Sequence, residues 1–156
     1  KFRQIIPMWI ICYIGNFIGI SLVCFLFVKS GSNHDLFIPY IESIVSGKLT
    51  FNVGELFIKG VLCNFIVCVG TYVGMKMQDD TAKTIIMMII VMAFVLPGFE
   101  HSIANMGYFT LGVTGLGTSF DWSLLPLHML IATAGNIVGG GVLLGFPLFM
   151  MIKPKK

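Results

Sequence analysis

One segment of the sequence gathers residues that could bind or protonate a small solute. It occupies residues 95–106, reads VLPGFEHSIANM, and holds four polar side chains: Glu100, His101, Ser102 and Asn105. The segment lies near the middle of an apolar stretch, at a depth where polar side chains are costly and usually face a pathway or one another. A histidine at this depth can exchange a proton near neutral pH, which suits a permeant that is the base of a weak acid.

Pro97 and Gly98 directly precede these polar residues and predict an interruption of the helix. Two spans plus a turn need about 40 residues, more than the stretch holds, so we expect one crossing that is broken near residues 97–102. Such a break is tolerated only where its backbone groups face protein or a watery cavity. A half-helix beginning near Ser102 would direct unpaired N–H groups toward that cavity and favour an anion. The alternative is a neutral His101 that hydrogen-bonds to Glu100 or to loop carbonyls as a structural staple.

The composition of the 156 residues excludes a soluble or disordered chain. Hydrophobic residues make up 56% of the sequence and charged residues 11%, and the mean hydropathy is +0.93. The net charge of +3 is too small and too scattered to indicate nucleic acid as a partner. The four cysteines and three histidines lack metal-ligand spacing, and the sequence offers no catalytic set. We therefore expect no enzyme activity, metal or cofactor.

Four apolar stretches predict an all-α membrane protein with a single transmembrane domain over residues 1–156. The stretches cover about 5–28, 53–75, 84–120 and 125–152, against a requirement of about 20 residues for a spanning helix. With four crossings, seven Lys and Arg residues share the side that holds both termini. The positive-inside rule then places both termini in the cytoplasm of a plasma (inner) membrane.

A short internal repeat links the first and last stretches. The sequence GNFIG occupies residues 15–19, and GNIVG occupies residues 135–139. The two helices cross in opposite directions, which is the relation between equivalent helices of an inverted repeat. If the last three stretches form one repeat unit, the first stretch ends another unit. Two helices would then precede this chain, and the intact protein would have six.

Four further residues are candidates for the pathway or its support. Asn64 and Asn136 lie inside the second and fourth stretches, where amides can satisfy the freed backbone of a broken segment. Lys48 stands at the outer entry to the second stretch, where it attracts anions into a vestibule or only snorkels to the interface. Phe94 stands nearly two helical turns before His101 and could narrow the path there.

Three sequence blocks together resemble the formate/nitrite transporter family, which includes hydrosulfide channels. The blocks are GFEHSIANM at residues 98–106, GVLCNFIVC at 60–68 and GNIVGGG at 135–141, and their order and spacing fit along the whole chain. The resemblance implies an aquaporin-like inverted-repeat helical bundle of six helices, of which the second and fifth are broken. It also implies homopentamers with a pore in every protomer, and it makes this chain helices three to six.

Carried over by position, the resemblance makes His101 the central pore histidine and Lys48 the vestibule lysine. Asn105 becomes a neighbour of the histidine in the broken segment, and Phe94 becomes a hydrophobic constriction. The expected function is a passive channel for small monovalent anions of weak acids, with hydrosulfide favoured and formate and nitrite close behind. Two alternatives stay open: a proton-coupled carrier and a membrane scaffold subunit that transports nothing.

Overall fold

The computed structural model describes residues 2–32, 34–116 and 120–152, and these residues form helices without any strand. In chain order the elements are α1 (Phe2–Lys29), α2 (His34–Leu49), α3 (Val53–Lys76), α4 (Asp80–Val95), α5 (Ser102–Leu116), the 3₁₀-helix η1 (Trp122–Leu124), α6 (Leu125–Ile137), the π-helix η2 (Val138–Gly145) and α7 (Phe146–Ile152). Three helical runs are long and apolar enough to cross a membrane: Gln4–Lys29, Val53–Lys76 and Trp122–Met151. The predicted all-α membrane architecture is confirmed.

The helices divide into two compact units. The first unit lies within residues 1–51 and 103–126 and contains α1, α2, η1 and nearly all of α5. The second unit lies within residues 52–102 and 127–156 and contains α3, α4, η2, α7 and most of α6. Part of the predicted third stretch, residues 117–119, lies outside the described residues, as do the terminal lysines that support the predicted orientation.

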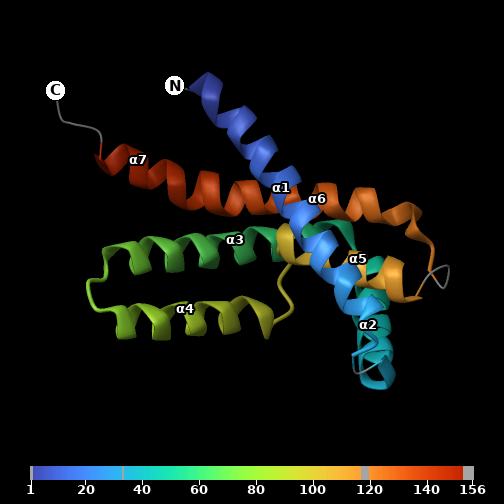
Figure 1. Cartoon of the computed structure of the whole chain (residues 1–156). Coiled ribbons are helices and arrows are strands. Elements are labelled where there is room, and N and C mark those ends of the chain that lie inside the picture. The colour runs from blue at the N-terminus through green and yellow to red at the C-terminus, as the bar shows by residue number, and fades with distance from the viewer. Residues whose placement is uncertain (1, 33, 117–119, 153–156) are drawn as a thin grey trace. The chain divides into compact units, whose positions relative to one another are not determined.

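In the second unit, α3 lies between α4 and the last helical run (Figure 1). Asn52 is the N-cap of α3, and its Oδ1 accepts hydrogen bonds from the N–H groups of Gly54 (2.9 Å) and Glu55 (3.3 Å). Asp79 is the N-cap of α4, and its Oδ1 accepts a hydrogen bond from the Ala82 N–H at 2.6 Å. Side-chain caps of this kind satisfy the orphan donors at a helix start. These caps allow a connection of only a few residues between α3 and α4.

Glycines allow the backbones of α3 and the last helical run to approach closely. A Cβ added to Gly135 would lie 2.5 Å from the carbonyl oxygen of Phe57, and one added to Gly139 would collide with the carbonyl oxygen of Val61. Membrane helices gain packing and interhelical contacts through such small residues because lipid supplies no hydrophobic drive between them. The glycines therefore determine how near the polar groups of one helix come to those of the other.

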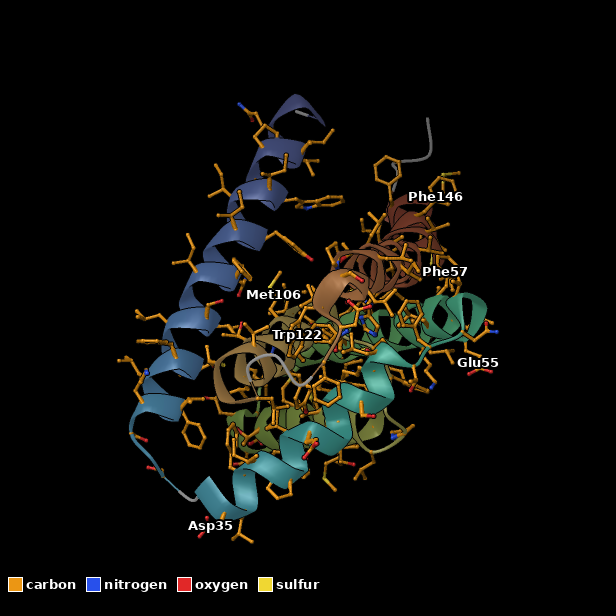
Figure 2. The ribbon with its side chains drawn as sticks, turned by 90° about the vertical axis from the view of Figure 1, so that its right-hand side faces the viewer. Asp35, Glu55, Phe57, Met106, Trp122 and Phe146 are labelled. Atoms are coloured by element: carbon orange, nitrogen blue, oxygen red, sulfur yellow. The ribbon has the colours of Figure 1, made fainter. Side chains whose placement is uncertain are left out.

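Helix α2 occupies the segment between the first two predicted spans, for which the apolar pattern predicts no helix. Its buried residues Ile41, Val45 and Leu49 recur every four positions and form one face. A Cβ on Gly112 of α5 would lie 2.9 Å from Val45 Cγ2, so α2 packs against α5 within the first unit. Figure 2 shows α2 as one continuous helix that starts near Asp35. Charged residues lower the hydropathy of this segment, so the apolar pattern of the sequence does not predict the helix.

Helix α1 touches α5 along a narrow stripe and is otherwise exposed in the described structure. The Ser21 and Thr110 hydroxyls lie 3.2 Å apart, and the Cys24 thiol lies 3.8 Å from the Gly107 carbonyl oxygen. No residue of the most apolar 18-residue window of α1 is buried. In its GNFIG segment, the Asn16 amide donates to the carbonyl of Cys12 in its own helix at 2.8 Å. The inverted-repeat relation of α1 to the last helix stays a prediction.

We predict opposite effects for two alanine substitutions in the same π-helix. Gly139→Ala would force a methyl group into the Val61 carbonyl oxygen, whereas a Cβ on Gly141 meets nothing within 4 Å. Overpacking costs about 1–3 kcal/mol, and a backbone atom yields less than a flexible side chain. Gly139→Ala should therefore lower the thermal unfolding temperature of the purified full-length protein by several degrees, and Gly141→Ala should leave it unchanged or raise it. Equal melting of the two variants would contradict the close approach.

Candidate functional site

The break between α4 and α5 begins with a helix terminator built around Gly98. Gly98 has φ of +69°, a left-handed conformation that favours glycine. Its N–H donates to the carbonyl of Val95 at 3.0 Å, and the N–H of Phe99 donates to the carbonyl of Phe94 at 3.0 Å. These two bonds form a Schellman motif, with Pro97 just before the left-handed residue. The helix therefore stops at the place that the Pro-Gly pair predicts, and residues 96–101 lie between the half-helices.

The amide of Asn136 bonds to the broken segment on both sides of His101. Asn136 Nδ2 donates to the carbonyl oxygens of Glu100 (2.7 Å) and Gly60 (2.9 Å), and Oδ1 accepts from the N–H of Ser102 (2.9 Å). An unsatisfied backbone group in hydrocarbon costs several kcal/mol. One side chain thus provides partners for the chain leaving the break, for the first residue of α5 and for α3.

Asn64 of α3 also belongs to this hydrogen-bond network. Its Nδ2 donates to the carbonyl oxygen of Asn136 at 2.7 Å. A Cβ on Gly140 would lie only 2.5 Å from Asn64 Nδ2, so the glycine leaves room for the amide. The π-helix begins at Val138, and π-helical turns commonly occur at functional sites. The two predicted support asparagines are therefore joined to each other as well as to the break.

His101 lies at the centre of the break with its ring beside that of Phe94. The ring centroids are 5.7 Å apart and the planes meet at 28°, a stacked arrangement. Phe94 belongs to the last turn of α4, and both residues are half-buried. The two residues that were predicted as constriction and central histidine thus form one pair in the structure. The apolar ring of Phe94 and the titratable ring of His101 therefore lie against each other.

Glu100 faces a histidine that the sequence motifs did not single out. Its side chain is 9% exposed, and its Oε2 lies 3.8 Å from Nε2 of His128, whose side chain has no exposed surface. This is an ion-pair distance and is longer than a hydrogen bond. His128 lies on α6, two turns before Asn136, so one helix presents both an imidazole and an amide to the broken segment. An ionisable residue within an apolar span was the available signal.

Two predicted pathway residues, Lys48 and Asn105, belong to the first unit. Lys48 is in the last turn of α2, and its Nζ lies 5.4 Å from the centroid of the Tyr108 ring on α5. That distance fits a cation–π contact. Asn105 is 1% exposed and lies one turn before Tyr108 on α5. Within this unit, Lys48 of α2 thus contacts α5, the helix that carries Asn105, and Tyr108 is an addition to the predicted site.

One expectation about the start of α5 needs correction. A half-helix with unpaired N–H groups was expected to face the cavity, but the first of these groups, the N–H of Ser102, donates to Asn136. Both Ser102 and Asn136 are buried. The end of α5 is therefore partly neutralised by a side-chain acceptor, in the same way as a capped soluble helix. The remaining dipole still favours negative charge nearby.

A helix that breaks within an apolar stretch, with amides bonded to the break and ionisable side chains beside it, is typical of membrane transport proteins. The comparisons with known proteins agree. A model of the formate/nitrite transporter family matches residues 1–150. The chain belongs to this family, which comprises transporters and not enzymes.

Individual relatives give the extent of the similarity. YwcJ, an uncharacterized transporter of Bacillus subtilis (strain 168), is 30% identical over 160 residues, which cover 97% of this chain and 60% of YwcJ. The nitrite transporter NirC of Escherichia coli (strain K12) is 32% identical over 143 residues, 88% of this chain and 53% of NirC. A solved FNT family ion channel matches with a TM-score of 0.76 and 27% identity, over 89% of this chain and 56% of that one. The chain thus spans about half to three fifths of these relatives.

We predict that Asn136→Ala destabilises the broken segment strongly. The change removes the partners of the Ser102 N–H and of two carbonyls, and each buried group left unsatisfied costs about 1–3 kcal/mol. The folded, oligomeric fraction of the purified protein should fall sharply. Asn64→Ala should cause a smaller loss, because it removes one bond to the last helical run and a long contact from the Cys68 thiol. Thr71→Ala is the control, because the Thr71 hydroxyl bonds only to the Val67 carbonyl of its own helix. An Asn136→Ala protein as stable as this control would contradict the assigned network.

Proposed function

We propose that the protein containing this chain is a passive channel for small monovalent anions of weak acids. The observation that carries the proposal is the break at residues 96–101, where half-buried His101 stacks on Phe94 and Asn136 supports the backbone. Family membership supports the same conclusion, and the solved relative is an ion channel, which supports a channel over a carrier. A mid-span break supported by protein on one side is consistent with a pathway on the other.

In the proposed mechanism, three groups act on the anion in turn. Lys48 raises the local anion concentration at the vestibule by its positive charge. The Phe94 ring contributes an apolar constriction that hydrated ions such as chloride do not pass. His101 exchanges a proton with the solute there, because a dry constriction favours the neutral acid over its anion. Asn105 is proposed to contact the anion as a neighbour of the histidine in sequence.

Hydrosulfide is the first candidate substrate, followed by formate and nitrite. All three are small, carry one negative charge and are bases of weak acids, so the same histidine chemistry serves each. NirC is named a nitrite transporter, which supports nitrite as a test substrate. The family name supports formate.

The proposed setting is a multi-pass protein of the plasma (inner) membrane with both termini in the cytoplasm. We propose that two further helices precede this chain in the intact protein and that five copies assemble, each with its own pore. The GNFIG and GNIVG segments support the inverted repeat, and the greater length of the relatives supports the additional helices. The other broken helix would then line the second half of the pore.

Flux into proteoliposomes that hold the full-length protein tests the proposed function. Hydrosulfide, formate, nitrite and chloride would be compared at matched concentration and pH. Flux of one or more weak-acid anions that does not saturate, with chloride excluded, is the expected result. Dependence on a pH gradient that persists at saturating substrate would favour the proton-coupled carrier. Flux equal to that of empty liposomes, from folded and oligomeric protein, would favour the scaffold subunit.

We predict that His101→Ala changes the size of the flux and its pH profile while the oligomer stays intact. Loss of a positioned proton donor typically lowers a rate by about 10²-fold or more, so a loss of at least about tenfold is expected for the weak-acid anion. His34→Ala, at the first residue of α2, is the matched control for the loss of a histidine. Transport that is unchanged at every pH would remove His101 from the mechanism.

We predict that Lys48→Gln lowers anion flux severalfold at low ionic strength, because the vestibule loses its attractive charge. The difference from wild type should shrink as salt is raised, since the Debye length falls to about 8 Å at 0.15 M. Lys29→Gln is a close control: its Nζ also lies over an aromatic ring, 5.7 Å from the centroid of Phe25, and it ends a helix of the same unit. A loss for Lys48→Gln that does not depend on salt would contradict an electrostatic role.

A further inference from the structure

An acidic residue beside the proposed anion path poses an electrostatic problem. Glu100 is adjacent to His101 in the chain, and Glu100 as a whole residue is only 7% exposed, so water screens its carboxylate little. The repulsion between two like charges grows as the effective dielectric constant falls. An ionised Glu100 would therefore oppose any anion that approaches His101. A pathway for anions through this break requires some means of cancelling that charge.

The structure places an imidazole where it can do so. His128 Nε2 lies 3.8 Å from Glu100 Oε2, and the His128 side chain has no exposed surface. A polar side chain buried this deeply in an apolar span is expensive unless it serves a partner. His128 is also the single ionisable residue of α6, Leu125–Ile137.

We propose that His128 is a positioning residue that cancels the charge of Glu100, so that the pair holds one proton and carries no net charge beside the anion path. Either the carboxyl holds the proton and the imidazole is neutral, or the imidazolium faces the carboxylate. The pair has a net charge of zero in both arrangements. Cancelling the charge requires the two groups to be close, but it does not require a hydrogen bond between them. This inference rests on the proposed function, because it concerns an anion at His101.

Hydrogen bonds fix the backbone of Glu100 at both its carbonyl and its N–H. The Glu100 carbonyl accepts from Asn136 at 2.7 Å, and its N–H donates to the carbonyl of Lys59 at 3.4 Å. Because Asn136 and His128 belong to the same helix, α6 holds both the main chain and the side chain of Glu100. The main chain from which the Glu100 side chain extends is thereby fixed, and the side chain itself is 9% exposed.

Few other charges surround the pair. The nearest titratable residue in the chain is His101, on the broken segment. Helix α3 carries exposed Glu55 and Lys59 and buried Cys63, followed toward its end by Cys68, Tyr72 and Lys76, and α4 carries Asp80 and Lys83 near its start. Figure 2 shows Glu55 pointing outward at the start of α3. The part of α4 from Ile85 to Val95 carries no ionisable residue. The basic group at ion-pair distance from the Glu100 carboxyl is the His128 imidazole.

The test compares three variants of the full-length protein: His128→Leu, Glu100→Gln and the double variant. Formate flux into proteoliposomes is measured over a range of pH and divided by wild-type flux at each pH, which cancels the titration of His101 and of the permeant. His128→Leu should lose flux increasingly as the pH rises, by about tenfold or more at the alkaline end, because no imidazole then cancels the negative charge of the Glu100 side chain. The double variant should recover most of this loss, and His34→Leu should match wild type.

Two results would overturn the inference. One is a His128→Leu profile that runs parallel to wild type at every pH. The other is a double variant as impaired as His128→Leu, because a purely structural imidazole would not be rescued by removing the charge of its neighbour. A loss of flux that is equal at all pH values therefore indicates packing alone.

Thermal unfolding of the same variants keeps the inference testable apart from transport. Removing one partner of a buried pair is more harmful than removing both. The double variant should therefore melt above His128→Leu, even if His128→Leu yields little folded protein. If wild type shows no flux but this rescue of stability is seen, the proposed function fails and the pairing stands. If wild type transports anions and the double variant melts no higher than His128→Leu, the pairing fails and the function stands.

Discussion

The interaction on which the rest of the structure depends is the hydrogen bonding of one amide to a broken helix. Ending α4 at Val95 and starting α5 at Ser102 leaves carbonyl and N–H groups without helical partners at membrane depth. Asn136 supplies both donors and an acceptor at this point, because an uncharged amide carries two N–H donors and a carbonyl oxygen on one side chain. A carboxylate offers acceptors only, and an ammonium offers donors only. The choice of residue follows from the need to satisfy both ends of the break.

The amide reaches the break because glycines bring two backbones together. Gly60 of α3 accepts from Asn136 at 2.9 Å, and a Cβ at Gly60 would lie 3.0 Å from the carbonyl oxygen of Ala132. Larger residues at Gly60, Gly135 or Gly139 would push α3 away from the last helical run and lengthen these bonds. Close packing and hydrogen bonding therefore support each other here. The Asn136 amide reaches its partners because α3 and the last helical run are close together, and its hydrogen bonds in turn stabilise that contact.

The sequence predicted those features that depend on neighbouring residues or on composition. Pro97 and Gly98 in an apolar run predicted the break to within a residue or two, and the hydropathy predicted an all-α membrane protein. The motif blocks predicted the family that the comparisons then showed. Helix α2 was missed because Asp35, Pro39 and Glu42 mask the four-residue spacing of its buried face. That spacing indicates an amphipathic helix, but it does not indicate a membrane-spanning helix.

Other features depend on contacts between distant segments and could not be predicted from the sequence. The Glu100–His128 pair joins residues on separate helices, and no local pattern links them. The π-helix at 138–145 contains Gly140, which packs against Asn64 of α3, and the sequence pattern does not distinguish this π-helix from an α-helix. The capping of Ser102 by Asn136 reversed part of an argument from helix dipoles, which treated the end of α5 as free. Local propensity identifies where a helix stops, whereas the partner of each freed group is a property of the folded chain.

The two GN segments show the same principle within one sequence. Asn136 bonds to three groups outside its own helix through its side chain, whereas Asn16 donates to Cys12 within α1. Gly135 and Gly139 lie against the backbone of α3, whereas Gly15 and Gly19 meet nothing within 4 Å. The motif is therefore a capacity for close approach and amide bonding that is realised only where another helix and a broken segment are present. Under the proposed inverted repeat, the second broken helix would give Asn16 the partners that Asn136 has here, and α1 would lose the exposure that distinguishes it from the last helix.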